Sequence, residues 1–205
     1  MNRSIILAGT ILFVCVASFA ARPLGADDYA TLEKGKSGFE LGFDNNQNLA
    51  FSVKHAPLKD VELSAEYAIP NGTSFAFDQV VINAKVTLAE KSLAGLDYGL
   101  KVKYGNATKT IGLTGIATLQ NKSFNVHGNV SCLPNVPLTF LVAGELETLE
   151  PIEPVGELSV AGADINGLVG LRYELSEGNT FDAAAIFPVA GAGISSQFIG
   201  FTSEF

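Results

Sequence analysis

The stretch that decides the fold is Gln197-Phe198-Ile199-Gly200-Phe201-Thr202-Ser203-Glu204-Phe205. In steps of two from its end, one parity reads Phe, Ser, Phe, Ile and Gln, and the other reads Glu, Thr, Gly and Phe. The first parity is mostly large and apolar, and the second is mostly small or polar. This is the period of a β-strand with one apolar side. Termini usually fray into water, so an aromatic final residue predicts a strand that continues to Phe205.

The same period of two recurs along the chain from residue 37 onward. It is clearest at 61–69, 80–89, 96–104, 124–131 and 169–176, where Val, Leu, Ile, Phe and Tyr alternate with Glu, Lys, Asn, Gly and Ser. Turn-forming residues separate the alternating runs at short intervals, which favours an up-and-down meander of antiparallel strands. We expect twelve strands, at 37–43, 49–55, 60–69, 75–89, 95–104, 109–120, 123–132, 138–147, 155–163, 168–175, 180–187 and 196–205.

Two of these runs are weak. In 138–147, Leu141 and Ala143 fall on the polar parity, and 155–163 is built almost entirely of small residues. Eight or ten strands are the alternatives if such segments merge or lie outside the sheet. The expected turns include 149–154, which contains two prolines, and the Asp-Ile-Asn-Gly run at 164–167.

The N-terminus has the pattern of a secretory signal peptide. A short positive region that contains Arg3 is followed by an apolar run from Ser4 to Phe19 and then by small residues. We expect cleavage after Ala20, with Ala26 as the alternative position. The chain then divides into a signal peptide at 1–20, a short polar lead-in at 21–36 and a β-domain at 37–205. The lead-in is expected to form one or two helical turns, or to be flexible. After cleavage Cys132 is the only cysteine, so the domain has no internal disulfide.

The closing strand resembles that of bacterial outer-membrane β-barrels, the small porin-like and OmpA-like transmembrane barrels. The resemblance rests on Ile199, Phe201 and Phe205 and departs from the family pattern at Ser203, where an aromatic or aliphatic residue is usual. It implies that these three residues form an assembly signal read by the outer-membrane assembly machinery. It also implies that the chain lies in the lipid bilayer of the bacterial outer membrane.

Alternation alone does not say which face of the sheet is inside. In a soluble barrel the apolar face points inward, and in a membrane barrel it points to lipid while the polar face lines the lumen. Aromatic residues gather near predicted strand ends, as in the interfacial girdles of membrane barrels. Charged residues make up only 17% of the chain, which is sparse for a solvated outer face. We therefore expect an all-β, antiparallel, up-and-down transmembrane β-barrel.

Composition and spacing also exclude several kinds of chemistry. The chain carries 13 Lys and Arg against 21 Asp and Glu without a basic run, which argues against nucleic-acid binding. His55 and His127 are the only histidines, and neither belongs to a catalytic or metal-binding pattern. We expect no enzyme activity, no metal and no cofactor. The charged residues on the polar parity are expected to line the lumen, either as an ion-pair network or as a wall that selects solutes: Glu62, Glu66, Lys85, Asp97, Lys101, Lys103, His127, Glu145, Glu147, Arg172 and Glu174.

These patterns favour a narrow porin-like channel for small polar solutes or ions. A similar barrel with a closed lumen, acting as a structural anchor, is one alternative. A secreted soluble barrel that resembles lipocalins and holds an apolar ligand is the other. The sequence predicts no particular oligomeric state.

Overall fold

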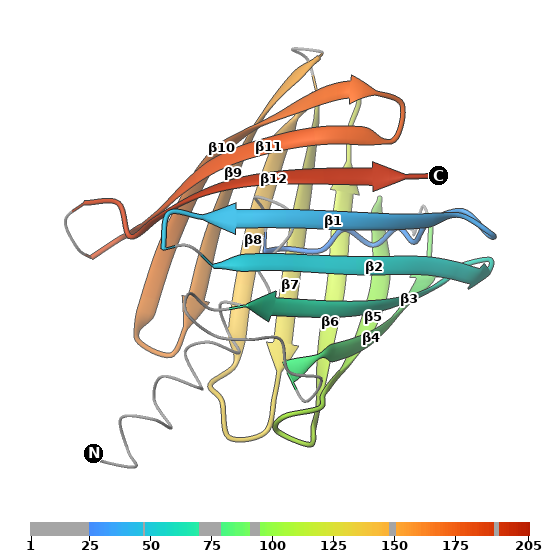
Figure 1. The fold of residues 1–205 in the computed structure, drawn as a ribbon, viewed down its shortest axis with the longest axis horizontal. Coiled ribbons are helices and arrows are strands. Elements are labelled where there is room, and N and C mark those ends of the chain that lie inside the picture. The colour runs from blue at the N-terminus through green and yellow to red at the C-terminus, as the bar shows by residue number, and fades with distance from the viewer. Residues whose placement is uncertain (1–24, 47, 70–78, 91–94, 148–150, 191–192) are drawn as a thin grey trace.

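The computed structural model describes residues 25–46, 48–69, 79–90, 95–147, 151–190 and 193–205. In this part of the chain, alternating residues form twelve β-strands joined mostly by short connections (Figure 1). The strands are β1 (Ser37–Asp44), β2 (Leu49–Leu58), β3 (Val61–Ile69), β4 (Val81–Ala89), β5 (Leu96–Gly105), β6 (Thr110–Gln120), β7 (Phe124–Cys132), β8 (Thr139–Leu146), β9 (Ile152–Ala161), β10 (Asp164–Ser176), β11 (Asn179–Pro188) and β12 (Ser196–Glu204).

Each strand pairs antiparallel with its neighbours in sequence, and β12 returns to pair with β1, so the sheet closes into a barrel. In this seam Leu41 lies opposite Phe201. Ser37 and Phe205 exchange two backbone hydrogen bonds of 2.8 Å each beyond the last paired residues. The prediction of a twelve-stranded up-and-down barrel, closed by the strand at the C-terminus, is confirmed. Closure leaves no unpaired sheet edge among the described strands.

The weak run predicted at 155–163 is a full barrel strand, but two predicted turns near it are wrong. The chain reverses at Gly162 and Ala163, and β10 begins at Asp164, inside the expected turn 164–167. Gly162 supplies the positive φ of 63° that this tight reversal needs. Pro154 was expected in a turn and instead lies in β9, one residue beyond Val155, where pairing with β8 ends. A proline there leaves no bond to β8 unmade.

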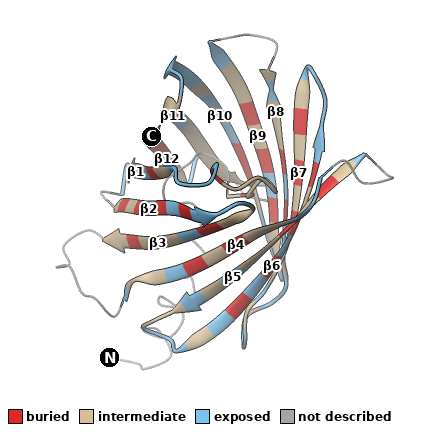
Figure 2. Ribbon diagram, turned by 90° about the vertical axis from the view of Figure 1, so that its right-hand side faces the viewer, coloured by how far each residue is buried: buried red, intermediate tan, exposed pale blue. Residues whose placement is uncertain are grey.

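The two faces of the barrel differ sharply in polarity. On the outside, large apolar side chains are exposed, among them Ile82 at 53%, Leu171 at 52% and Val53 at 50%. The polar residues between them are buried on the inside, so exposed and buried positions alternate along the strands (Figure 2). An apolar belt of this size fits lipid rather than water. The lipocalin-like alternative requires the apolar parity to face inward and is therefore wrong.

A stretch of non-strand chain runs inside this barrel before β1. Residues 25–36, here called the lumen segment, lie behind β1 and β2 in Figure 1 and reach the barrel end at which β1 begins. Ala26 and Leu32 are buried there, whereas 33–36 are exposed. At the barrel end, Gly35 donates a backbone hydrogen bond of 2.7 Å to Ala56.

The lumen segment consists of bends, one turn and irregular chain, so the prediction of one or two helical turns there is wrong. The described part of the chain contains no helix long and apolar enough to cross a membrane. The expected signal peptide at 1–20 lies outside the described residues, as do residues 21–24 of the expected lead-in.

Candidate functional site

The lumen is the candidate functional site, because the inward positions of the strands bring its polar side chains together. The charged residues expected there lie on the inner parity of six strands, with one just beyond a strand end. They are Glu62 and Glu66 on β3, Lys85 on β4, Asp97, Lys101 and Lys103 on β5, His127 on β7, Glu145 on β8 and Arg172 and Glu174 on β10, with Glu147 just after β8. All are at least partly buried except Glu174, which is exposed near the β10–β11 turn.

Two lysines on neighbouring strands form the centre of one charge cluster. Lys85 and Lys101 are direct cross-strand partners on β4 and β5, an arrangement that is unfavourable for like charges. Carboxylates surround them. Lys101 Nζ lies 3.2 Å from Glu66, and Lys85 Nζ lies 3.9 Å from Glu62. These two ion pairs between strands therefore bring together four of the residues that the sequence predicted to line the lumen.

The lumen segment supplies the other carboxylates of this cluster. Asp27 lies 3.1 Å from Lys101 Nζ, and Asp28 lies 3.3 Å from Lys85 Nζ. Burial alone would raise the pKa of the Asp27 carboxyl, but the ammonium groups of Lys101, Lys85 and Lys103 outweigh burial and hold that pKa below its ordinary value. Asp27 is therefore a carboxylate in the lumen. The set Lys101, Lys85, Glu62, Glu66, Asp27 and Asp28 is here called the Lys101 cluster.

A second charge cluster is built on the opposite part of the wall. Arg172 on β10 contacts Glu145 at 2.8 Å, Asp182 at 3.2 Å and Glu153 at 3.8 Å. Asp182 is fully buried. His127 Nε2 lies 3.4 Å from Glu145 on the neighbouring strand. These five residues come from β7, β8, β9, β10 and β11 and are here called the Arg172 cluster; Asp182 and Glu153 were not expected.

A third ion-pair group lies at the seam of the barrel. Lys54 on β2 contacts Glu40 on β1 at 3.1 Å and Glu204 on β12 at 3.0 Å. It therefore links the three strands on either side of the closure. Glu204 falls on the polar parity of the closing strand, which points to an inward position. The alternation in 37–43 and 49–55 is too weak to assign Glu40 and Lys54.

Wall side chains also hold the backbone of the lumen segment. Asn129 makes a two-point contact with Asp27: its Oδ1 accepts a bond of 2.7 Å from the Asp27 amide, and its Nδ2 donates one of 2.8 Å to the Asp27 carbonyl. The Tyr29 amide donates to Thr118 at 3.2 Å, and the Tyr29 carbonyl accepts from Thr87 at 3.1 Å. These bonds satisfy backbone groups that a segment without secondary structure cannot satisfy itself.

Two acidic side chains extend this backbone contact along the segment. Glu157 on β9 accepts the Ala26 amide at 2.7 Å, and Glu62 on β3 accepts the Leu32 amide at 3.0 Å. The side chains that bond the segment backbone thus come from strands β3, β4, β6, β7 and β9. Asn129 and Thr87 fall on the polar parity that the sequence predicts. Thr118 and Glu157 were missed, because nothing in the strands pointed to a partner inside the barrel.

One part of the inner wall is apolar. Leu141 and Ala143 on β8 face inward with Val155 on β9 and Leu168 on β10, and Ala26 of the lumen segment packs against them. This explains why the alternation in 138–147 is blurred. The lumen segment packs against this apolar patch only through Ala26 among the contacts described here. The rest of the segment is held by the polar contacts given above.

The residues expected to signal assembly lie on the outer face of β12 and at its end. Ile199 is 49% exposed and Phe205 is 65% exposed. The Phe201 ring lies 5.8 Å from that of Phe39 across the seam. Ser203, where the family pattern is broken, donates a hydrogen bond of 2.8 Å to Asn179 on β11. Among the described residues, no group of His, Cys, Asp and Glu side chains is arranged to hold a metal ion.

Comparison with solved structures identifies barrels of the same architecture. The KdgM porin aligns with 83% of this chain and 99% of its own at a TM-score of 0.61 and 10% identity. A second structure is titled as the KdgM porin in complex with disordered oligogalacturonate, at a TM-score of 0.58. An outer-membrane channel from Pseudomonas putida F1 aligns with 87% of this chain and 98% of its own at a TM-score of 0.58 and 9% identity.

At this level of identity the likeness is one of fold: the chain has the barrel architecture of outer-membrane porins and channels, as its closing strand predicted. No protein-family model and no curated protein sequence matches the chain.

Proposed function

We propose that the chain is a bacterial outer-membrane barrel that conducts small polar solutes or ions through a narrow lumen. The observation that carries this proposal is the opposite polarity of the two faces of a closed barrel. Exposed Leu, Ile, Val and Phe side chains face outward, and Lys, Glu, Asp, Asn and Thr side chains face inward. A lipid-facing exterior around a polar interior is the arrangement of a transmembrane pore. The porin and channel folds described above support the same function.

Export and assembly are part of this proposal. Residues 1–20 act as a cleaved signal peptide, and Ile199, Phe201 and Phe205 form the signal read by the assembly machinery. Deleting Phe205 should abolish insertion while leaving signal-peptide cleavage intact, because the deletion removes an exposed aromatic residue and the two backbone bonds to Ser37. Cell fractionation with a heat-shift gel for folded barrel measures this. Normal insertion of the shortened chain would contradict the assembly signal.

The inner wall should favour cations. Acidic side chains outnumber basic ones at the inward positions of the strands. The acidic ones include Glu40, Glu62, Glu66, Asp97, Glu145, Glu153, Glu157, Glu174, Asp182 and Glu204, and the basic ones described are Lys54, Lys85, Lys101, Lys103 and Arg172. Fixed charges of one sign around a narrow pore raise the local concentration of counter-ions. The lumen-lining role of the residues predicted from the sequence is part of this proposal.

Planar-bilayer recording tests the channel. Purified, folded protein from a porin-deficient host should give discrete current steps, with a reversal potential in a salt gradient that indicates cation preference. Lys101→Glu should shift that potential further toward cations, which shows that the current passes through this lumen. Current steps whose reversal potential is the same for Lys101→Glu as for the parent would come from another pathway or from a contaminant.

The closed structural barrel is the second candidate function, and the lumen segment favours it. Residues 25–32 occupy space that a solute would need, held by bonds to strands β3 to β9. A folded, membrane-inserted sample that gives no current under any condition would support the anchor and contradict the channel.

A further inference from the structure

The inner wall recognises the lumen segment as a protein recognises a bound peptide. Side chains of Asn129, Thr118 and Thr87 bond both the amides and the carbonyls of the segment, instead of leaving them to water. A two-point contact from one carboxamide to a single residue reads the backbone and not the side chain. Main-chain bonds of this kind give affinity for an extended peptide, and pockets for its side chains give selectivity.

The side-chain selectivity at this place is for acidic residues. Lys85 and Lys101 face each other across two strands, and their mutual repulsion is relieved by carboxylates. Two of those carboxylates, Asp27 and Asp28, belong to the segment and lie 3.1 and 3.3 Å from the lysines. The neighbouring apolar patch accepts a small side chain, that of Ala26. The wall therefore offers one small apolar position followed by two anionic positions.

We propose that the inner wall between β3 and β9 is a binding site for an acidic peptide without regular secondary structure, and that the lumen segment is its tethered occupant and acts as a plug. The effect on conduction rests on the proposed channel function, but peptide binding does not. A tethered ligand has a high effective concentration, so a free peptide competes poorly with it. The site becomes available when the segment loses its hold on the lysines.

The partial exposure of these pairs makes release feasible. The side chains of Asp27 and Asp28 keep 31% and 34% exposure, whereas Asp182 in the Arg172 cluster has none. Water screens the attraction in a partly exposed ion pair, so separating such a pair costs less than breaking a buried pair, which leaves a buried charge without its partner. The segment is therefore attached at positions that can exchange their partner for a solute or for water.

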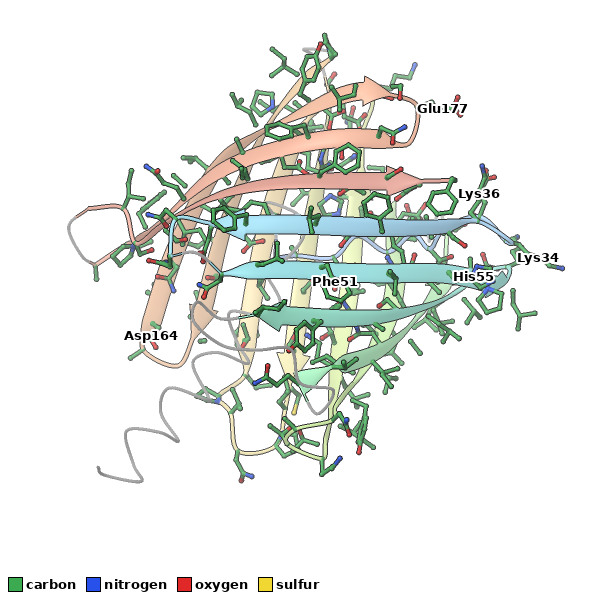
Figure 3. The ribbon with its side chains drawn as sticks, viewed as in Figure 1. Lys34, Lys36, Phe51, His55, Asp164 and Glu177 are labelled. Carbon is green, nitrogen blue, oxygen red and sulfur yellow. The ribbon has the colours of Figure 1, made fainter. Side chains whose placement is uncertain are left out.

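Thiol labelling tests whether the pairs hold the segment. In a Cys132→Ser background, Leu32→Cys places a thiol at a position that is 9% exposed, and a membrane-impermeant maleimide reports its release in detergent-solubilised, folded protein. Asp27→Lys with Asp28→Lys should raise the labelling rate at least about tenfold, because attraction becomes repulsion. Adding Lys101→Glu and Lys85→Glu should restore slow labelling by exchanging the charges. Asp164→Lys with Glu177→Lys changes the net charge equally at two exposed positions outside the lumen segment (Figure 3) and should leave the rate unchanged.

Peptide binding tests whether the wall is a site. The probe is a fluorescent peptide with the sequence of residues 25–36, GADDYATLEKGK, measured by anisotropy. It should bind the Asp27→Lys, Asp28→Lys protein at least about tenfold more tightly than it binds the parent, whose site is occupied. The same peptide with both aspartates replaced by asparagine should bind at least about tenfold more weakly than the acidic one.

The outcomes separate this proposal from the channel. Equal labelling of the reversed and parent proteins, or no binding of the acidic peptide to the released protein, would overturn the peptide site whatever the conductance. Release and peptide binding in a protein that never conducts would support the site and contradict the channel. Equal binding of the acidic and amide peptides would contradict the proposed selectivity for acidic side chains.

Discussion

Arg172 and Lys101 both lie between carboxylates inside the barrel, but their partners come from different kinds of structure. Arg172 contacts Glu145, Asp182 and Glu153, and all three are on strands β8, β11 and β9. Lys101 contacts Glu66 on β3, but its closer partner, Asp27, lies on the lumen segment. The Arg172 cluster therefore joins fixed parts of the wall, whereas the Lys101 cluster joins the wall to a part of the chain that is not itself a strand.

This difference indicates different roles for two clusters that are alike in composition. Charges held by neighbouring strands cannot separate without opening the sheet, so the Arg172 cluster belongs to the stability of the barrel. Charges on a tethered segment can separate while the sheet stays closed, so the Lys101 cluster belongs to the occupancy of the lumen. The two roles predict that mutations in one cluster change unfolding and mutations in the other change access.

Removing the Arg172 side chain should have the largest effect. Arg172→Ala leaves Asp182, which has no exposed surface, and Glu145 without their cation. We expect a loss of about 3–5 kcal/mol in the free energy of unfolding, the range for one partner of a buried ion pair. Urea titration of the barrel refolded into lipid vesicles measures it. Arg172→Lys should recover part of the loss. A loss below about 1 kcal/mol would show that this cluster stabilises the barrel no more than an exposed ion pair does, which would contradict the prediction.

Filling Gly170, two residues from Arg172 on the same inner face, should have the next largest effect. A Cβ there would lie 2.7 Å from the Ala183 carbonyl oxygen and 2.9 Å from the Ala184 Cβ. Gly170→Ala should therefore cost about 1–3 kcal/mol through overpacking. Gly115→Ala is the matched control, because a Cβ at Gly115 meets nothing within 4 Å, and it should change stability by no more than about 0.5 kcal/mol. Equal losses would show that the wall near Arg172 is not rigid.

Removing the Lys101 side chain should destabilise the barrel less than either change on the rigid side of the wall. In Lys101→Met, Asp27 can leave with the lumen segment and become hydrated, so only Glu66, which is 20% exposed, stays in the wall without this partner. We expect a loss of about 1 kcal/mol in the same urea titration. Thiol labelling at position 32 should rise in this variant and stay unchanged in Arg172→Lys. A loss as large as that of Arg172→Ala would remove the distinction between the two clusters.

Salt should have the smallest effect and should act on one cluster only. The Debye length falls from about 10 Å at 0.1 M to about 3 Å at 1 M, which weakens partly exposed pairs more than buried ones. Labelling at position 32 should rise about two- to threefold over this range in the parent. It should not rise with salt in the Asp27→Lys, Asp28→Lys protein, because salt there screens a repulsion instead of an attraction. A parent rate that is independent of salt would contradict ionic retention of the segment.

Most of the wall could be predicted from the sequence because each strand reports its own environment. The alternation of Leu, Val and Tyr with Lys and Asp in β5 follows directly from one face in lipid and one in the lumen. Prediction from the sequence is wrong where a residue's environment is set by a side chain on a neighbouring strand. Asn166 and Gly167 form a turn signal, but Gly167 lies within a strand and is covered by the Phe187 ring, with a Cβ position 2.6 Å from that ring.

The lumen segment could not be predicted from its own residues. Its contacts with the wall fall at Ala26, Asp27, Tyr29 and Leu32, a spacing set by the strands around it and not by a helix or strand period. A sequence reading that looks for periodicity sees only a polar lead-in. The two aspartates were visible, but their lysine partners are more than fifty residues away in sequence.

The bonds between Ser37 and Phe205 also bear on timing. They join the first strand of the barrel to the last residue of the chain, so this contact has the largest sequence separation in the sheet. Contacts of this kind form late in folding because the cost of closing so long a loop must be met first. Until β12 arrives, β1 and β11 each present an unpaired edge that can recruit another chain. A helper protein would therefore be needed during the time before β12 pairs with β1. Faster pairing of these two strands would shorten that time.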